Sequence, residues 1–170
     1  MKTNAVPAYD VSDNPTGCCP KFQPEVWDGQ TLHFENKRFV RVKTRSVDHV
    51  PMDIDPVFQH TFKEIQKAHA DDPDDVIVLS RDVSDVEGEH FFAVSKDVPN
   101  LENVRLSGDY VTRVFEGPYE NAPLWEQDFK AFLKQQNHAV DRIYYFYTTC
   151  PKCADVYGKN YVVAVAKLAD

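Results

Sequence analysis

The stretch Val111-Thr-Arg-Val-Phe-Glu-Gly-Pro-Tyr-Glu120 decides the fold expected for this chain. Alternating side chains over residues 105–115 predict a half-buried strand, because successive residues of a strand point to opposite faces. Gly117-Pro118 then predicts a turn. A helix from about residue 123 to 136 follows, since four large apolar residues recur there at helical spacing: Trp125, Phe129, Phe132 and Leu133.

The same order of elements is expected earlier in the chain. Alternation begins at Phe39, and Asp55-Pro56 supplies a helix cap and a first-turn proline. An acidic turn then joins two short apolar runs, which predicts a hairpin. The second helix is followed by two further strands, with a Cys-Pro-Lys-Cys loop between them. The expected strands are residues 39–45, 76–80, 90–95, 105–115, 142–149 and 160–168.

This order predicts an α+β fold made of two strand-helix-strand-strand repeats, about 38–98 and 103–168. They would form a largely antiparallel sheet with two packed helices, and the groove between the repeats is the natural pocket. Residues 1–37 are expected to be an extended N-terminal arm, because prolines stand there among polar residues without any periodicity. Residues 38–170 would form a single domain.

Composition excludes several classes of protein. A net charge of −8 repels phosphate backbones, so nucleic acid is not an expected partner. No run reaches the roughly 18 apolar residues of a membrane span, and no apolar run follows the amino terminus as in an export signal. We therefore expect a cytoplasmic protein without a membrane partner.

Four cysteines stand in two distant pairs, Cys18 with Cys19 and Cys150 with Cys153. Together they could supply the four ligands of a zinc ion, although neighbours in one strand point oppositely, so Cys18 and Cys19 would both bind only from an irregular arm. Cys150 and Cys153 also have the spacing of a redox-active dithiol. Buried or merely local thiols are the third interpretation. We expect no cofactor, with zinc as the one metal that these residues leave open.

The residues also point to a family. The segment Tyr110 to Glu120, followed by Trp125 on a helix, resembles the second repeat of the GyrI-like small-molecule-binding superfamily. Four blocks near both ends of the chain are similar to a bacterial subgroup often labelled GyrI-like hydrolase: Cys18-Cys-Pro-Lys-Phe, Trp27-Asp28, Cys150-Pro-Lys-Cys-Ala and Tyr157-Gly-Lys-Asn-Tyr161.

This resemblance implies a cleft that takes flat, often cationic organic molecules. Members serve as effector-binding domains of transcription regulators, as stand-alone binders or as hydrolases. The chain departs from the regulators near the last strand, where they carry a glutamate facing the cation and this sequence offers Lys159.

Glu116 and Tyr119 are the candidate catalytic residues. Among aromatic rings, desolvation would raise the pKa of the Glu116 carboxyl and suit it to act as a general base, whereas a solvent-exposed strand end is the alternative. The Gly-Pro turn fixes where the Tyr119 ring points, either at a ligand or onto the helix start. Both residues are also expected to bind ligand, together with Tyr110, Trp125, Tyr145 and Tyr147, although an aromatic stripe at these spacings is more often core than pocket.

The sequence thus favours a stand-alone protein that binds a small, flat aromatic or amphipathic molecule in the inter-repeat groove. A hydrolase that uses Glu116 as general base in the same groove is the alternative. A zinc or redox module built on the cysteines is a third hypothesis. Convergence of Glu116 and Tyr119 on one enclosed aromatic pocket would support the first two.

Overall fold

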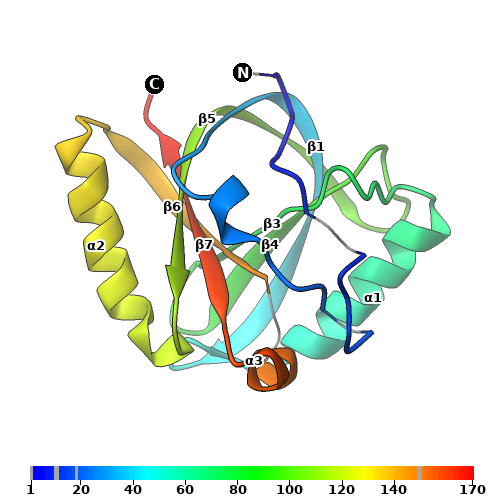
Figure 1. Cartoon of the computed structure of the whole chain (residues 1–170). Coiled ribbons are helices and arrows are strands. Elements are labelled where there is room, and N and C mark those ends of the chain that lie inside the picture. Colours follow the sequence, from blue (N-terminus) through cyan, green and yellow to red (C-terminus); the bar gives the residue numbers. More distant parts are fainter. Residues whose placement is uncertain (1, 10–11, 18, 149–150) are drawn as a thin grey trace.

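The computed structural model describes residues 2–9, 12–17, 19–148 and 151–170. Within them the chain has an α+β fold with a mostly antiparallel sheet (Figure 1), as the sequence predicts, although the sheet has seven strands rather than the six expected. The strands are β1 (Thr31–Val47), β2 (Val50–Pro51), β3 (Val78–Asp82), β4 (Glu87–Ala93), β5 (Glu102–Glu116), β6 (Val140–Tyr147) and β7 (Tyr161–Leu168). The helices are α1 (Ile54–Lys67), α2 (Ala122–Gln135) and α3 (Pro151–Tyr157), with short 3-10 turns η1 (Pro24–Val26) and η2 (Tyr119–Asn121).

The sheet closes on itself. Its strand order is β2-β1-β4-β3-β6-β7-β5, and β5 pairs back with β1. The long strand β1 makes this possible, because it pairs with β4 along one edge and with β5 along the other. Its register with β5 shifts between Phe34 and Lys37, where an irregularity lets the strand bend. The pairing of Ser80 with Tyr145 joins β3 to β6 and so links the two halves of the chain.

Three local features differ from the sequence prediction. Strand β1 begins at Thr31, within the segment expected to be an arm. Helix α1 begins at Ile54 rather than after Asp55; Asp53 precedes it and accepts a hydrogen bond from the Arg45 backbone N–H at 2.7 Å. Residues 151–153 of the expected Cys-Pro-Lys-Cys loop are the start of helix α3, which opens with a proline, a residue favoured at the first helical position; Cys150 lies outside the described residues.

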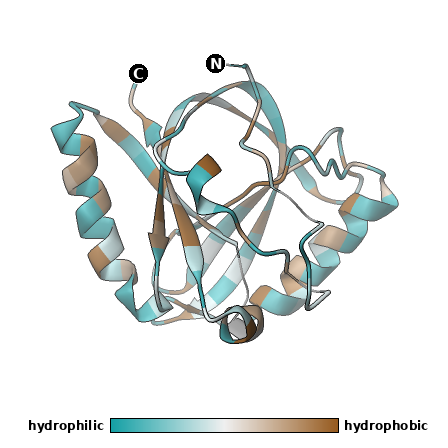
Figure 2. Cartoon of the chain, in the orientation of Figure 1, coloured by the Kyte–Doolittle hydropathy of each residue, from teal (hydrophilic) through white to brown (hydrophobic). Residues whose placement is uncertain are grey.

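Helices α1 and α2 pack on the outer face of the closed sheet, on opposite sides of the molecule (Figure 1). Helix α1 covers a cluster around Val40 and Phe92, and α2 packs Phe129 and Leu133 onto Val111. Apolar and polar residues alternate along both helices, as expected for helices with one buried face (Figure 2). None of the helices in the described residues is long and apolar enough to cross a membrane.

The inner face of the sheet is covered by the N-terminal segment, whose described residues 2–9, 12–17 and 19–30 run across it in Figure 1. Trp27 is fully buried there, 5.3 Å from the ring of Phe146, and its indole Nε1 donates to the Ala8 carbonyl oxygen at 3.1 Å. Thr112 Oγ1 of β5 donates to the Trp27 carbonyl oxygen. The N-terminal segment is therefore part of the core, and its Trp27-Asp28 block is hydrogen-bonded to β5.

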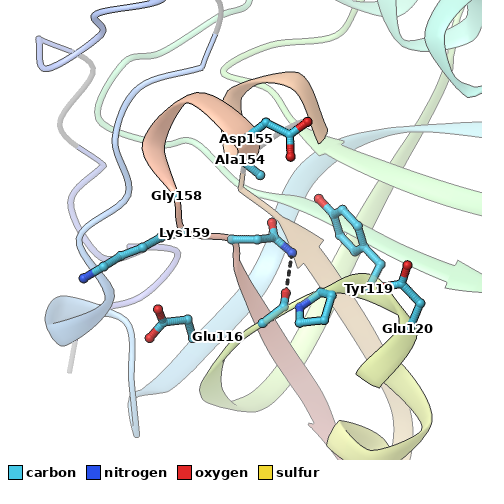
Figure 3. Close-up of a pocket in the computed structure, with 10 residues that line it drawn as sticks. Glu116, Tyr119, Glu120, Ala154, Asp155, Gly158 and Lys159 are labelled. Carbon is cyan, nitrogen blue, oxygen red and sulfur yellow. Dashed lines mark hydrogen bonds between the residues drawn. The ribbon is translucent and has the colours of Figure 1, made fainter.

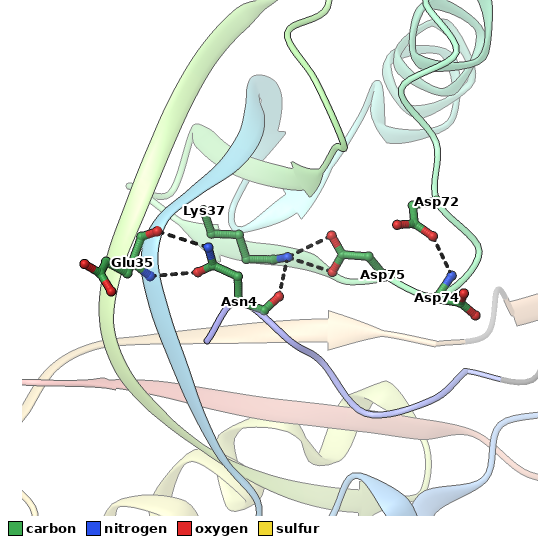
Figure 4. Close-up of polar contacts among 6 residues, drawn as sticks. All are labelled: Asn4, Glu35, Lys37, Asp72, Asp74 and Asp75. Carbon is green, nitrogen blue, oxygen red and sulfur yellow. Dashed lines mark hydrogen bonds and ion pairs between the residues drawn. The ribbon is translucent and has the colours of Figure 1, made fainter. Parts of the chain in front are cut away.

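A buried lysine holds the start of this segment (Figure 4). Lys37 is 5% exposed, and its Nζ lies 2.7 Å from Asp75 Oδ1 and 2.9 Å from the Asn4 carbonyl oxygen. The ammonium group also lies 5.5 Å from the ring centroid of Phe34 and 5.9 Å from that of Phe39. Because a buried charge is costly unless it is paired, these contacts fix Asn4 against the sheet.

Candidate functional site

Tyr110 lies in the core rather than on a groove wall. Tyr110 and Thr112 lie on the same face of β5, as the alternating pattern predicts. This face is the inner face of the sheet, which Trp27 covers. The side chain is fully buried, with its ring 4.8 Å from Phe34, and burial raises the pKa of its hydroxyl. Among the described residues that hydroxyl has no hydrogen-bond partner. Tyr110 therefore stabilises the interior and does not contact the surface.

Trp125 is also a packing residue. It is 5% exposed and stacks on Phe115 of β5, with ring centroids 5.9 Å apart and planes 18° apart. Phe129, one helical turn further along α2, meets the same Phe115 ring edge-on. The Trp125 indole therefore anchors α2 on the outer face of the sheet. It is a core residue rather than a ligand-binding one.

The other three predicted aromatic residues do come together on the outer side of the sheet. Tyr119 and Tyr147 meet edge to face with ring centroids 5.8 Å apart, and Tyr147 stacks on Tyr145 at 6.4 Å. We call these three residues the tyrosine row. Their neighbours in the sequence, Tyr144 and Phe146, point inward to the core. The row begins at the Ser80–Tyr145 pairing, where the two halves of the sheet join.

Two carboxylates, Asp82 and Glu126, act electrostatically on the tyrosine row, and Glu126 is also paired with Lys130 at 2.9 Å. Tyr147 is 45% exposed, yet burial of its hydroxyl end, helped by the charge of Asp82, raises its pKa to about 12. Burial, with smaller contributions from Glu126 and Asp82, also raises the pKa of Tyr145. Both phenols therefore stay neutral near pH 7. Aromatic faces next to carboxylates attract organic cations and electron-poor rings.

Tyr119 also belongs to a second feature, an open depression of about 410 Å³. Its walls are the β5–η2 turn and the segment from α3 to β7, which Asn160 holds together: Gly117 N donates to its carbonyl oxygen at 3.0 Å, and its Nδ2 donates to the Gly117 carbonyl oxygen at 2.9 Å. Gly117 has a φ of 141°, which favours glycine. Residues 116–120, Ala154, Asp155 and residues 158–160 line the depression.

Glu116 and Tyr119 share this depression but do not converge (Figure 3). The Tyr119 ring points toward α3, where Asp155 lies, whereas the Glu116 carboxylate lies on the other side with Lys159. Glu116 is exposed, so the aromatic enclosure expected around it is not found. The depression thus offers a solvent-accessible carboxylate on one side and a phenol on the other. Sequence reasoning missed Asp155 and Asn160, because only the fold brings α3 beside the Gly-Pro turn.

The two described cysteines, Cys19 and Cys153, both contact Thr16, although the sequence separates them widely. Thr16 Oγ1 lies 3.3 Å from Cys153 Sγ and accepts a hydrogen bond from the Cys19 backbone N–H at 3.4 Å. Cys18 and Cys150 lie outside the described residues. Within the described part of the chain, no three His, Cys, Asp or Glu side chains are grouped to hold a metal ion. A zinc site made of all four cysteines stays a prediction.

Several solved structures share this fold. A hydrolase from Listeria innocua matches with a TM-score of 0.58 at 10% identity, over 84% of this chain and 92% of that chain. An uncharacterized conserved protein from Listeria innocua matches with a TM-score of 0.59, also at 10% identity and over the same shares. SAV2435 bound to tetraphenylphosphonium gives a TM-score of 0.51 at 10% identity, over 84% of this chain and 94% of that chain. At such identities the likeness shows the fold alone.

No curated protein matches this chain. A protein family described as "Bacterial hydrolase" does match, over residues 9–168. That range takes in most of the N-terminal segment, with Trp27, as well as the β5–η2 turn and helix α3. The chain therefore belongs to the bacterial hydrolase family.

Proposed function

We propose that this protein binds a flat aromatic or amphipathic organic molecule against the tyrosine row, in the groove between its two predicted repeats. The observation that carries the proposal is the continuous contact of the Tyr119, Tyr147 and Tyr145 rings at the junction of β3 and β6. Tyr147 is 45% exposed, so part of its side chain is available to a ligand. The resemblance to GyrI-like proteins and the likeness to SAV2435 bound to tetraphenylphosphonium agree with this role.

Stacking and charge would supply the binding energy. An organic cation over an exposed ring gains about 0.5–1 kcal/mol, and more where the ring is desolvated. Asp82 and Glu126 add attraction for a positive ligand, because their charges already act on the row. The adjoining depression, at about 410 Å³, falls within the rough range of 300–1,000 Å³ typical of small-molecule sites. A ligand that extends past Tyr119 would enter it.

Calorimetric titration with tetraphenylphosphonium tests this proposal. We expect Tyr147→Ala to weaken binding about two- to tenfold, because losing a stacking surface costs roughly 0.5–1.5 kcal/mol. Tyr147→Phe keeps the ring and should bind nearly as well as the unchanged protein. Phe62→Ala is the matched control, since Phe62 is 47% exposed on α1 and lies outside the row. Equal affinity for Tyr147→Ala and the unchanged protein would contradict the proposal.

Hydrolysis of a small organic molecule is the second candidate function, and the family description favours it. In this reaction, water on the exposed side of Glu116 would give its proton to the carboxylate as it attacks the bound carbon. The phenol of Tyr119, on the other side of the depression, would protonate the leaving atom. Because the two groups diverge, the substrate must span the Gly117-Pro118 turn.

Glu116→Gln separates catalysis from binding. Turnover of p-nitrophenyl acetate, a general hydrolase probe, is expected to fall at least a hundredfold in this variant while its affinity for tetraphenylphosphonium is kept. Glu120→Gln, at the other glutamate of the depression, is the control and should keep its turnover. If Glu116→Gln hydrolyses the ester as fast as the unchanged protein, Glu116 is not the base.

A further inference from the structure

Two hairpin ends expose apolar side chains that do not pack in the core. They are residues 47–53, around strand β2, and residues 82–87, at the turn of the β3–β4 hairpin. We call these two segments the hairpin tip. Five of the eleven large apolar side chains that are exposed among the described residues lie there, each 41–66% exposed: Val47, Val50, Met52, Val83 and Val86. Exposed apolar side chains that gather in one place mark a contact with another molecule.

Backbone hydrogen bonds hold the two hairpin ends side by side. The Ser46 N–H donates to the Val86 carbonyl oxygen at 2.8 Å, and the His49 N–H donates to the Asp85 carbonyl oxygen at 2.9 Å. Asp48 and His49 have φ angles of 48° and 68°, as in a tight two-residue hairpin turn. The hairpin tip is therefore ordered before any partner arrives, which lowers the entropic cost of binding.

The hairpin tip carries negative charge around its apolar side chains. Its two segments contain no lysine or arginine and five carboxylates: Asp48, Asp53, Asp82, Asp85 and Glu87. On the adjoining strand β1, Lys43 Nζ lies 3.3 Å from Glu87, and Arg45 stands opposite Glu87 in the pairing with β4. Set against the five carboxylates, these two cations leave an excess of three negative charges. A partner with an apolar centre and a positively charged rim complements this surface.

The shape of the hairpin tip favours a helix over a strand as its partner. Strand β2 lies at the edge of the sheet, but it has only two residues, and Pro51 has no N–H to donate to a further strand. A helix satisfies its own backbone groups and can present an apolar stripe flanked by lysines or arginines. Two hairpin tips of the same chain would repel each other, because both are negatively charged.

We propose that the hairpin tip is a docking surface for a basic amphipathic helix of a partner protein. The apolar stripe of that helix would cover the five exposed side chains, and its lysines or arginines would face the carboxylates. The partner would stand beside the tyrosine row, since Asp82 of the hairpin tip acts electrostatically on Tyr147. The inference does not depend on which ligand or reaction the candidate site serves.

Titration of the full chain with a labelled synthetic helix, followed by fluorescence anisotropy, tests the proposal. The probe is a peptide of about 18 residues, or five helical turns, with leucines along one face and lysines on the others. Its matched control carries glutamates in place of the lysines and should not bind. The double variant Val50→Ser/Val86→Ser should bind the lysine peptide about tenfold more weakly, because two apolar contacts are lost. Asp85→Asn should weaken binding about two- to fivefold at low salt.

Val140→Ser and Asp128→Asn are the matched control variants, because both residues are exposed and lie outside the hairpin tip. Both should keep the affinity of the unchanged protein for the lysine peptide. Equal affinity of Val50→Ser/Val86→Ser and the unchanged protein, or equal binding of the lysine and glutamate peptides, contradicts the proposal. Sedimentation equilibrium gives a further test: self-association of the unchanged protein that the double variant abolishes would make the hairpin tip a contact between copies and overturn the proposal.

Discussion

Acid should destabilise this protein through one buried histidine, His90 of β4. It is 4% exposed under α1, with the Phe58 ring edge-on at 4.9 Å. Its Nδ1 lies 2.7 Å from Ser80 Oγ, and its Nε2 lies 2.9 Å from Thr44 Oγ1. Hydroxyl groups can satisfy a neutral imidazole on both sides but cannot offset a buried positive charge.

Burial of His90 decides that acid lowers the free energy of unfolding, and by how much. Desolvation lowers the pKa of His90 from its ordinary 6.5 to about 4, although the charges of Glu89 and Asp53 act in the opposite direction. Between pH 6.5 and about pH 4, the unfolded chain therefore binds a proton at His90 more strongly than the folded protein does. The contribution of neutral His90 to the free energy of unfolding is complete above pH 6.5 and is lost as the pH falls toward 4. Two and a half pKa units correspond to about 3 kcal/mol, of which about 2 kcal/mol is lost by pH 5.

Urea unfolding at pH 7, 6 and 5, followed by the fluorescence of the two buried tryptophans, Trp27 and Trp125, measures this loss. The His90→Gln variant isolates it from other titrating groups, because Gln carries no proton to gain. The stability difference between the unchanged protein and His90→Gln should shrink by about 2 kcal/mol from pH 7 to pH 5. His60→Gln, at an exposed position on α1, is the control. If the free energies of unfolding of the unchanged protein and of His90→Gln fall by the same amount from pH 7 to pH 5, burial of His90 does not cause the loss.

Three further substitutions test the parts of the fold that hold the site. Trp27→Ala should lower the free energy of unfolding by about 3–5 kcal/mol, because it empties a fully buried position; a loss under 1 kcal/mol in urea unfolding would place the N-terminal segment outside the core. Thr112→Val should cost about 1–2 kcal/mol by the same assay, since the Trp27 carbonyl loses its donor. Glu89→Gln should cost about 2–3 kcal/mol at pH 7, because Arg41 and Arg81 lose their shared carboxylate. Those guanidinium groups lower the pKa of Glu89, so this cost should shrink as the pH falls below 4.5.

Much of the fold is predictable because its signals are local. The helical spacing around Phe129 places α2 within one residue of its observed ends, Ala122 and Gln135. The acidic turn between β3 and β4 likewise marks a real hairpin. Helix α3 was missed because a helix of seven residues shows too little periodicity, although its opening proline was an available signal.

The site was harder to predict, because alternation assigns residues to a face without showing what covers it. Tyr110 and Glu116 were expected to line a groove, yet the face of Tyr110 is buried by Trp27, which comes 83 residues earlier in the sequence. The run of aromatics in β6 predicts two rings on each side. Only the pairing of β6 with β3 decides that Tyr145 and Tyr147 face outward.

The position of Tyr119 links the two proposed activities. The N-terminal segment covers the inner face, so a ligand reaches the outer face and the rim of the sheet. Tyr119 touches the tyrosine row through Tyr147 and also lines the depression that contains Glu116. A compact ligand stacked on Tyr147 would be bound without contact to Glu116. A substrate long enough to pass over the Gly117-Pro118 turn would meet both residues, so ligand length should decide whether binding leads to hydrolysis.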